Sequence, residues 1–227
     1  MSNELEFSTV LASTVHDMKN SLGMLLSSLD EVRDSVSEEV RGSSPFTALE
    51  YEAQRMHGDL IQLLSLYRLS EDKLSATVEE QLVSDFLDEQ QAHHRPLVEG
   101  LGIQLKVHTD PEAEQAYFDA QLVSGVLTNV INNAIRYANS ELHLNARSDN
   151  DWLVLSVEDD GPGYPEHMLA VDFSGSERVD FSTGSTHLGL YFAERMAGMH
   201  ATGNRQGFTH LRNGGELGGS VFELWLP

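Results

Sequence analysis

Apolar residues recur every three or four positions along the first part of the chain, and this pattern restricts the fold more than any other feature. Residues 4–40 contain no proline and a single glycine, Gly23. Steps of three and four place side chains on one side of an α-helix. The pattern predicts one long helix, from Glu4 to about Val40, with a stripe to bury that consists of Phe7, Leu11, Val15, Met18, Leu22, Leu25, Leu29, Val32 and Val36.

A second helical segment follows after residues 41–45, whose sequence Arg-Gly-Ser-Ser-Pro breaks the first helix. Its apolar steps alternate between four and three, which is typical of a heptad seam. Two helices joined by a short turn form a hairpin, and one hairpin cannot bury both stripes well. We therefore expect two hairpins to pair as a homodimeric four-helix bundle, the alternative being a hairpin packed on the rest of its own chain. The seam consists of Leu49, Ala53, Met56, Leu60, Leu63 and Tyr67.

His16 lies off the apolar stripe, so its imidazole should face water. Asp17 follows it, and Asn20 lies one turn beyond Asp17 on the same face of the helix. Taken alone, this stretch favours an ordinary surface histidine. An exposed imidazole beside a carboxylate is also a suitable place to add and remove a phosphoryl group.

The pattern changes from Leu74 onwards to a mixture of short helices and strands. A segment rich in Gly, Ser and Asp, residues 161–187, shows little periodicity and is too long for an ordinary connection, which suggests a functional lid. The order predicts an α+β protein, with a helical hairpin at residues 1–73 and an α/β sandwich at residues 78–227. We expect helices at 83–92, 118–137 and 188–199, and strands at 102–108, 141–146, 152–157, 208–211 and 220–226.

Composition excludes several classes of function. The chain has 14 Lys and Arg against 36 Asp and Glu, a net charge of −22, which argues against unspecific binding to nucleic acid or to an anionic membrane. The absence of cysteine rules out disulfides and thiolate metal sites. No apolar run approaches the ~18 residues of a membrane span, and no signal-peptide pattern opens the chain. A cytoplasmic protein without membrane insertion is the simplest interpretation.

Polar amides interrupt the helix expected at residues 118–137. Asn129 and Asn133 are four positions apart and share a face, and Arg136 lies one turn beyond Asn133. Amides beside an apolar face would be unfavourable in a core, whereas a bound ligand could form hydrogen bonds with them. An amide oxygen is a suitable ligand for Mg²⁺, and arginine can bind phosphate.

An acidic residue and glycines follow the strand expected at residues 152–157. A carboxylate at a strand end, such as Asp159, can accept a hydrogen bond from an exocyclic amine like that of adenine. Gly161 and Gly163 would let the backbone approach a ligand closely, although an acidic turn alone explains the pattern equally well. Residues 182–190 are mostly small and run from the loop into the next expected helix. This segment is either an anion-binding site at the helix N-terminus or a flexible loop with a capped helix.

The order and spacing of these segments resemble those of sensor histidine kinases. Residues 16–20 resemble the phosphoacceptor box of that family, and residues 129–137 its asparagine box. Residues 159–163 resemble its first glycine box, and residues 184–190 its second. The ending, residues 218–227, is similar to the closing strand of the same ATPase domain. The resemblance covers nearly the whole chain and implies an ATP-binding domain of the histidine kinase, Hsp90 and gyrase type.

The resemblance also implies roles for individual residues. His16 would take the γ-phosphoryl group of ATP, and Asp17 would orient the imidazole and accept its proton. Asp17 and Asn20 together match the pair with which the family positions water against a phosphoaspartate. Asn133 would hold Mg²⁺ on the phosphates, with Asn129 nearby.

The remaining roles concern the nucleotide. Asp159 would bind the adenine amine, while Arg136 and Tyr137 stand where the family usually has a basic and an aromatic residue. One departure is His187, which replaces the first glycine of the usual Gly-Leu-Gly-Leu and predicts a loosely held γ-phosphate. The nucleotide is expected to meet the glycine boxes at Gly161, Gly163, Gly184, His187, Leu188 and Gly189.

The sequence thus predicts a soluble, dimeric histidine kinase core that autophosphorylates on His16 and passes the phosphoryl group to an aspartate of a response regulator. Dephosphorylation of that regulator is a further expected activity. Because His16 is so near the start, either a separate sensor protein supplies the signal or this is the core of a longer chain. One alternative is a histidine phosphotransfer adaptor with a degenerate ATPase domain. Another is a chaperone-type or topoisomerase-type ATPase of the same fold.

Overall fold

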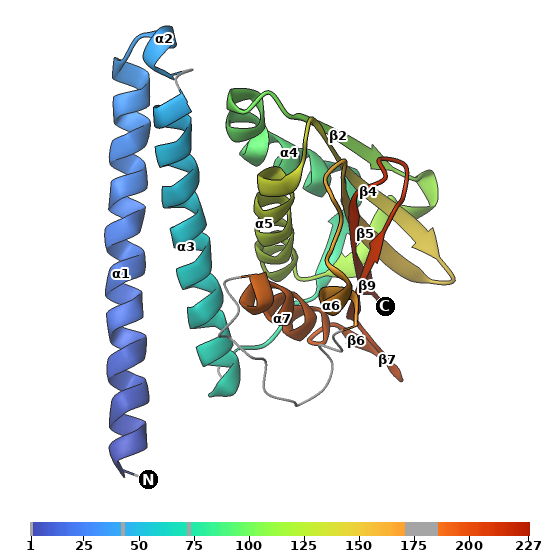
Figure 1. The fold of residues 1–227 in the computed structure, drawn as a ribbon. Coiled ribbons are helices and arrows are strands. Elements are labelled where there is room, and N and C mark those ends of the chain that lie inside the picture. The colour runs from blue at the N-terminus through green and yellow to red at the C-terminus, as the bar shows by residue number, and fades with distance from the viewer. Residues whose placement is uncertain (1, 42–43, 72–73, 171–185) are drawn as a thin grey trace. The chain divides into compact units, whose positions relative to one another are not determined.

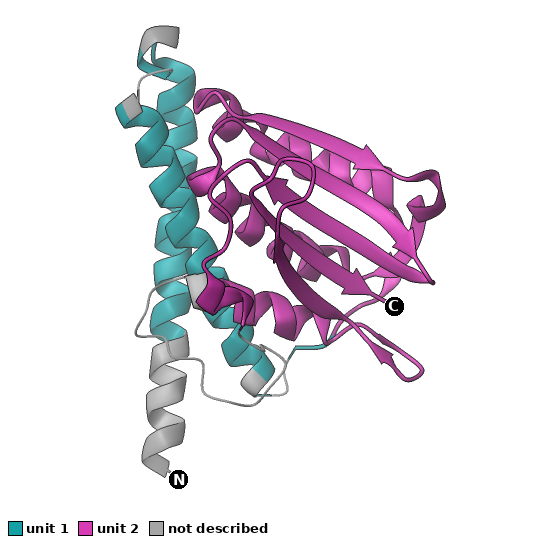
Figure 2. Ribbon diagram, turned by 45° about the vertical axis from the view of Figure 1, so that its right-hand side comes forward, with its two compact units in different colours: residues 1–75 teal, residues 76–227 magenta. Residues whose placement is uncertain are grey.

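The structure is a computed structural model that describes residues 2–41, 44–71, 74–170 and 186–227. The chain forms two compact units, Met1–Ser75 and Ala76–Pro227, which Figure 2 shows in different colours. Each unit has its own architecture and is considered by itself.

The first unit is a helical hairpin. Helix α1 (Ser2–Ser35) and helix α3 (Ser44–Ser70) run side by side, and the short helix α2 (Glu38–Arg41) lies between them in the sequence (Figure 1). The expectation that the first helix reaches Val40 is wrong, because α1 ends at Ser35. The Ser35 hydroxyl donates to the carbonyl oxygen of Val32 at 2.8 Å, and serine competes in this way with helix continuation.

Only part of the apolar stripe is buried within one hairpin. Val15 and Ala53 are 5% and 4% exposed. Leu25, in contrast, is 47% exposed, and Leu49, in the seam of the second helix, is 52% exposed. Large apolar side chains at helical spacing that remain in water are the kind of surface that pairing with a second hairpin would cover.

The second unit contains a mixed five-stranded sheet. Its strand order is β2-β4-β5-β9-β8, in which β2 and β4 are parallel and the other pairs antiparallel. Two small two-stranded sheets, β1-β3 and β6-β7, and a 3-10 turn, Pro111–Ala113, complete the described strands and turns. The strands are β1 (Glu79–Leu82), β2 (Gln104–Thr109), β3 (Gln115–Phe118), β4 (Glu141–Asp149), β5 (Trp152–Asp159), β6 (Ala201–Thr202), β7 (Arg205–Gln206), β8 (Phe208–Asn213) and β9 (Ser220–Leu226).

Three helices cover one face of this sheet: α4 (Val83–Gly100), α5 (Ala120–Tyr137) and α7 (Thr186–Ala197) (Figure 1). The core lies between the helices and the sheet. On β4 the buried side chains alternate with half-buried ones, as expected for a sheet covered on one face. The predicted fold class, a helical hairpin followed by an α/β sandwich, is confirmed. Fully buried core residues include Phe118, Leu127, Ile131, Leu144, Leu155 and Phe222.

The bounds of the three long helices in the second unit differ from the expectation, and α7 runs over Thr186–Ala197 rather than over residues 188–199. Helix α4 continues to Gly100 through Pro96, because its buried face continues with Leu97 and Val98. Helix α5 begins at Ala120 rather than at Phe118, which belongs to β3. The residue between them, Asp119, caps α5 by accepting hydrogen bonds from two backbone N–H groups of the first turn at 3.0 Å.

Part of the expected lid forms a short helix, α6 (Glu166–Leu169). Residues 171–185 of that segment lie outside the described residues. Within the described ranges, no helix combines the length and the apolar character that crossing a bilayer requires.

Candidate functional site

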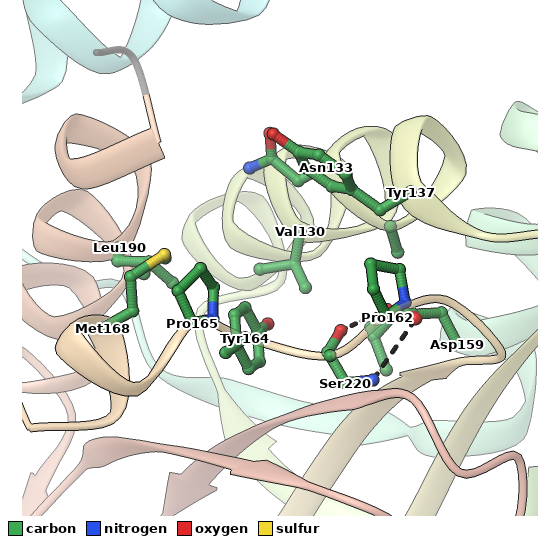
Figure 3. Close-up of a pocket in the computed structure, with 13 residues that line it drawn as sticks. Val130, Asn133, Tyr137, Asp159, Pro162, Tyr164, Pro165, Met168, Leu190 and Ser220 are labelled. Carbon is green, nitrogen blue, oxygen red and sulfur yellow. Dashed lines mark hydrogen bonds between the residues drawn. The ribbon is translucent and has the colours of Figure 1, made fainter. Parts of the chain in front are cut away.

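Helix α5, the ends of β5 and β9, the segment after β5 and the helices α6 and α7 enclose a cavity of about 190 Å³ (Figure 3). Apolar side chains form most of its wall, and a few polar groups converge on it. Such a pocket is the usual form of a small-molecule site. Its lining residues are Val130, Asn133, Ala134, Tyr137, Val157, Asp159, Pro162, Gly163, Tyr164, Pro165, Met168, Leu190 and Ser220.

Asp159 places a carboxylate at the pocket, although the residue is only 2% exposed. Its Oδ1 accepts hydrogen bonds from the backbone N–H groups of Gly161 at 2.8 Å and Ser220 at 3.3 Å. Its Oδ2 accepts a hydrogen bond from the Ser220 hydroxyl. These donors compensate for the burial of a charge. Because a carboxylate offers about four acceptor positions, one remains for a donor on a ligand.

Tyr164 lies next to Ser220 in the pocket (Figure 3). Burial raises the pKa of the Tyr164 phenol well above its usual range, and the charge of Asp159 acts in the same direction. A hydrogen bond with Ser220 has the opposite, smaller effect on this pKa. The phenol is therefore neutral at physiological pH and can serve as a hydrogen-bond donor.

The two asparagines of α5 lie on one face of the helix, as the spacing predicts. The Asn133 side-chain Nδ2 donates to Asn129 Oδ1 at 3.4 Å, which leaves the Asn133 carbonyl oxygen for a ligand. The Asn129 Nδ2 is buried without a hydrogen-bond partner in the described structure. A buried donor without a partner costs free energy, which a bound anionic oxygen would recover. The pair thus fits a magnesium-bound phosphate group.

Two glycines occupy positions that a larger residue could not. Gly163 has a φ of +81°, in the left-handed region that favours glycine. Gly189, in α7, packs so closely on α5 that a Cβ there would lie 2.5 Å from the Asn129 Nδ2. The second glycine box therefore brings α7 against the asparagine pair.

The structure brings most of the expected nucleotide residues together. Asn133, Tyr137, Asp159 and Gly163 line the pocket. Three more adjoin it, because Asn129 bonds to Asn133, Gly161 bonds to Asp159 and Gly189 packs on Asn129.

Two of the expected residues, Arg136 and Leu188, stand apart from the pocket lining in the described structure. Arg136 is exposed, with its guanidinium 5.6 Å from the centre of the Tyr137 ring. Leu188 does not line the cavity, whereas Leu190 does. Gly184 and the side chain of His187 lie outside what the structure describes.

Sequence reasoning missed Tyr164, Met168 and the role of Ser220 in holding Asp159. Ser220 could have been found as the small hydroxyl residue at the start of the closing strand. Tyr164 follows the glycines directly, but an aromatic residue at that position gives no signal of its own.

On the hairpin, His16, Asp17 and Asn20 are all exposed, as the position of His16 off the stripe predicts. The Asn20 Nδ2 lies 3.2 Å from His16 Nε2. Since an amide nitrogen can only donate, Nε2 accepts and the ring proton resides on Nδ1. Among the described residues, no hydrogen bond or ion pair joins Asp17 to His16. The Asp17 carbonyl oxygen instead accepts the Ser21 hydroxyl at 2.9 Å.

Comparison with known proteins agrees with this geometry. Residues 118–227 match the family described as histidine kinase-, DNA gyrase B-, and HSP90-like ATPase. The sensor histidine kinase CpxA of Escherichia coli K12 is 28% identical over 192 residues, which cover 82% of this chain and 40% of CpxA. The Acinetobacter baumannii histidine kinase AdeS has a TM-score of 0.60 at 17% identity, over 93% of this chain and 96% of that one. Full-length ShkA in complex with AMPPNP has a TM-score of 0.63 at 21% identity, over 96% of this chain and 44% of that one.

Residues 118–227 therefore form an ATPase domain of the histidine kinase, gyrase B and HSP90 type. The resemblance of the chain to the core of a sensor histidine kinase is confirmed, and CpxA is one such kinase. The likeness to AdeS and ShkA, at these low identities, establishes the fold. The chain spans 40% of the length of CpxA.

Proposed function

We propose that this protein is a protein-histidine kinase that binds ATP in the pocket between α5 and the end of β5 and phosphorylates His16. The observation that carries this proposal is the buried Asp159 carboxylate, held by three internal donors at an apolar pocket of an ATPase-type domain. The complex of the similar protein ShkA with AMPPNP supports the same interpretation.

The pocket favours adenine over guanine. The remaining acceptor position of Asp159 can take an N–H of the exocyclic amine of adenine, whereas guanine would present a carbonyl oxygen there. The Asp159 carboxylate and the guanine carbonyl oxygen would then be two acceptors facing each other, both without a donor. Such a mismatch in a buried site discriminates strongly against guanine. Apolar side chains such as Val130, Val157 and Leu190 offer surfaces against which a planar base can pack.

The phosphate end of the site lies along the asparagine pair. Asn133 would contribute its carbonyl oxygen to Mg²⁺, and the unpaired amide of Asn129 would donate to a phosphate oxygen. Arg136, exposed at the end of α5, adds a positive charge within reach of solvent-side phosphate. When bound, Mg-ATP supplies the phosphoryl group and the charge neutralisation on which phosphoryl transfer depends.

His16 is the nucleophile in this proposal. Its Nε2 lone pair is the one that Asn20 holds, so the Asn20 amide must turn away before a P–N bond forms at Nε2 and the P–O bond to ADP breaks. Asp17 then takes the proton of Nδ1. The same residues would later serve transfer from His16 to an aspartate of a response regulator, and Asn20 would position water for dephosphorylation of that aspartate.

The assembly and its input are part of the proposal. The exposed apolar side chains of the hairpin favour a homodimer. A receiver domain of a response regulator would dock on a surface that includes His16. The signal would come from a sensor, either a separate protein or one joined to the same chain. His187, in the second glycine box, would slow autophosphorylation by loosening the γ-phosphate.

The decisive experiment is incubation of the full chain with Mg²⁺ and ATP labelled at the γ-phosphate. Protein-bound label should be labile to acid and stable to base, as expected for phosphohistidine. His16→Ala should abolish this label, whereas His108→Ala, which removes an exposed histidine of β2, should retain it. Equal labelling of the His16→Ala variant would exclude the kinase assignment. A chain that binds no nucleotide but accepts phosphate on His16 from a phosphorylated regulator would be an adaptor.

A further inference from the structure

Asn213, the last residue of β8, holds the backbone of the pocket wall from outside the pocket. Its Oδ1 accepts the N–H of Tyr164 at 2.7 Å, and its Nδ2 donates to the carbonyl oxygen of Tyr164 at 2.9 Å. Asn213 itself is not among the residues that line the cavity. One side-chain amide thus satisfies both backbone polar groups of Tyr164, much as a neighbouring strand would.

The wall that Asn213 holds is poor in hydrogen-bond donors. It consists of residues 162–165, which begin and end with a proline, and proline has no backbone N–H. Only Gly163 and Tyr164 therefore have backbone donors, and Asn213 takes the second. The backbone also passes close to the amide, since a Cβ on Gly163 would lie 2.8 Å from Asn213 Oδ1. In the described structure, this one side chain supplies both hydrogen bonds of the Tyr164 backbone.

Asn213 lies opposite Ser220 in the ladder between β8 and β9. Ser220 donates to the carboxylate of Asp159, on the floor of the pocket. The two members of this cross-strand pair therefore bond to two different sides of the pocket. Ser220 bonds to the acid, as Figure 3 shows, and Asn213 bonds to the wall at Tyr164.

We propose that Asn213 is a positioning residue of the nucleotide site, which sets the wall 162–165 at the distance that admits the base. This inference rests on the proposed nucleotide binding. Asn213 acts without touching the nucleotide, because preorganised walls bind more tightly than walls that must be ordered on binding. Loss of the Asn213 amide should weaken nucleotide binding while every lining side chain is still present.

The test compares four proteins as full chains: wild type, Asn213→Ala, Asn213→Asp and the control Asn145→Ala. Asn145 is a half-buried residue of β4 between the buried Leu144 and Ala146, so its side chain belongs to the opposite face of the sheet. Calorimetry measures binding of a non-hydrolysable Mg-ATP analogue. Hydrogen exchange measures the protection of the Tyr164 amide without nucleotide, and tryptophan fluorescence measures the thermal midpoint.

In Asn213→Ala, the affinity should fall at least about tenfold, and the Tyr164 amide should exchange at least about tenfold faster. Asn213→Asp keeps an acceptor for the Tyr164 N–H but places a second acceptor beside the Tyr164 carbonyl oxygen. In that variant the amide should stay protected while the affinity falls. Asn145→Ala should change neither quantity, and all variants should keep thermal midpoints close to that of the control.

Several outcomes would overturn the inference. Faster exchange with wild-type affinity would show that the two bonds form but do not position the site. Unchanged exchange in Asn213→Ala would show that the bonds are absent in solution. Asn213→Ala could lose affinity because it unfolds. In that case a folded Asn213→Asp variant with wild-type affinity would refute the positioning role of Asn213. A wild-type chain that binds no nucleotide would remove the proposed function itself, whereas normal wild-type binding with unaffected variants would remove only the role of Asn213.

Discussion

His94 should make the second unit lose stability as the pH falls from neutrality, and the structure gives the size of the effect. The residue is 3% exposed on the inner face of α4. Its Nδ1 donates to the Gln90 carbonyl oxygen at 2.8 Å, and its Nε2 is buried without a partner in the described structure. A proton on Nε2 would therefore create a buried charge with no acceptor. Burial lowers the pKa of His94 to about 4, and the neighbouring His93 acts in the same direction.

The sign follows from proton uptake. The unfolded chain binds a proton at His94 near pH 6.5, whereas the folded chain does so only near pH 4, so stability falls as the pH decreases through this window. The full difference corresponds to about 3 kcal/mol, and about 2 kcal/mol of it should be lost between pH 7.5 and pH 5. Above pH 7.5 this residue should contribute no further change.

Urea unfolding at pH 7.5 and pH 5 measures this loss. Both tryptophans, Trp152 and Trp225, lie in the second unit, so their fluorescence reports its unfolding. Carboxylates also titrate near pH 5, and the comparison with His94→Leu removes their contribution. The variant should lose about 2 kcal/mol less than wild type over this range. The control His93→Gln, at an exposed position, should keep most of the wild-type pH dependence, because burial is the main cause of the lowered pKa of His94. An equal pH dependence in wild type and His94→Leu would refute the reasoning.

Three further predictions concern the site and the hairpin. Asp159→Asn should weaken Mg-ATP binding at least about tenfold by calorimetry, since the buried acceptor for the base is lost, and native affinity would place the nucleotide elsewhere. Asn20→Ala should spare labelling of His16 but slow the decay of phosphate on the regulator, and equal decay with either protein would exclude the phosphatase activity. Leu25→Glu places a charge on the exposed part of the stripe and should shift the chain toward monomer in sedimentation analysis at micromolar concentration. An unchanged mass would exclude this surface from the dimer contact.

Local patterns were enough to predict the elements that carry the pocket. The periodicity of β5 places Asp159 at a strand end, and the spacing of the amides on α5 places Asn129 and Asn133 on one face. Both relations depend only on neighbours in the sequence. Long-range packing decided one boundary that differed, because α4 continues through Pro96 where Leu97 and Val98 find a buried face.

The supports of the pocket could not be predicted in the same way. Asn213 holds Tyr164 across 49 positions of sequence, and Ser220 holds Asp159 across 61. These contacts exist because β9 pairs with both β5 and β8, and no local pattern specifies which strands will be neighbours. Most of the polar residues that a ligand would touch left a signal in the sequence, whereas the contacts that hold them in place depend on the pairing of strands far apart in the sequence.

The end of β5 shows how one strand links the ligand site to its support. Successive side chains of a strand point to opposite faces, so Glu158 and Asp159 face away from each other. Asp159 serves the pocket, while the buried Glu158 accepts the N–H of Leu217 at 2.5 Å and holds the turn between β8 and β9. That turn carries Asn213 and Ser220 at its two ends. Two adjacent carboxylates thus have linked roles. Glu158 bonds to the turn between β8 and β9, and Asn213 and Ser220 at the ends of that turn bond to the pocket wall and to Asp159.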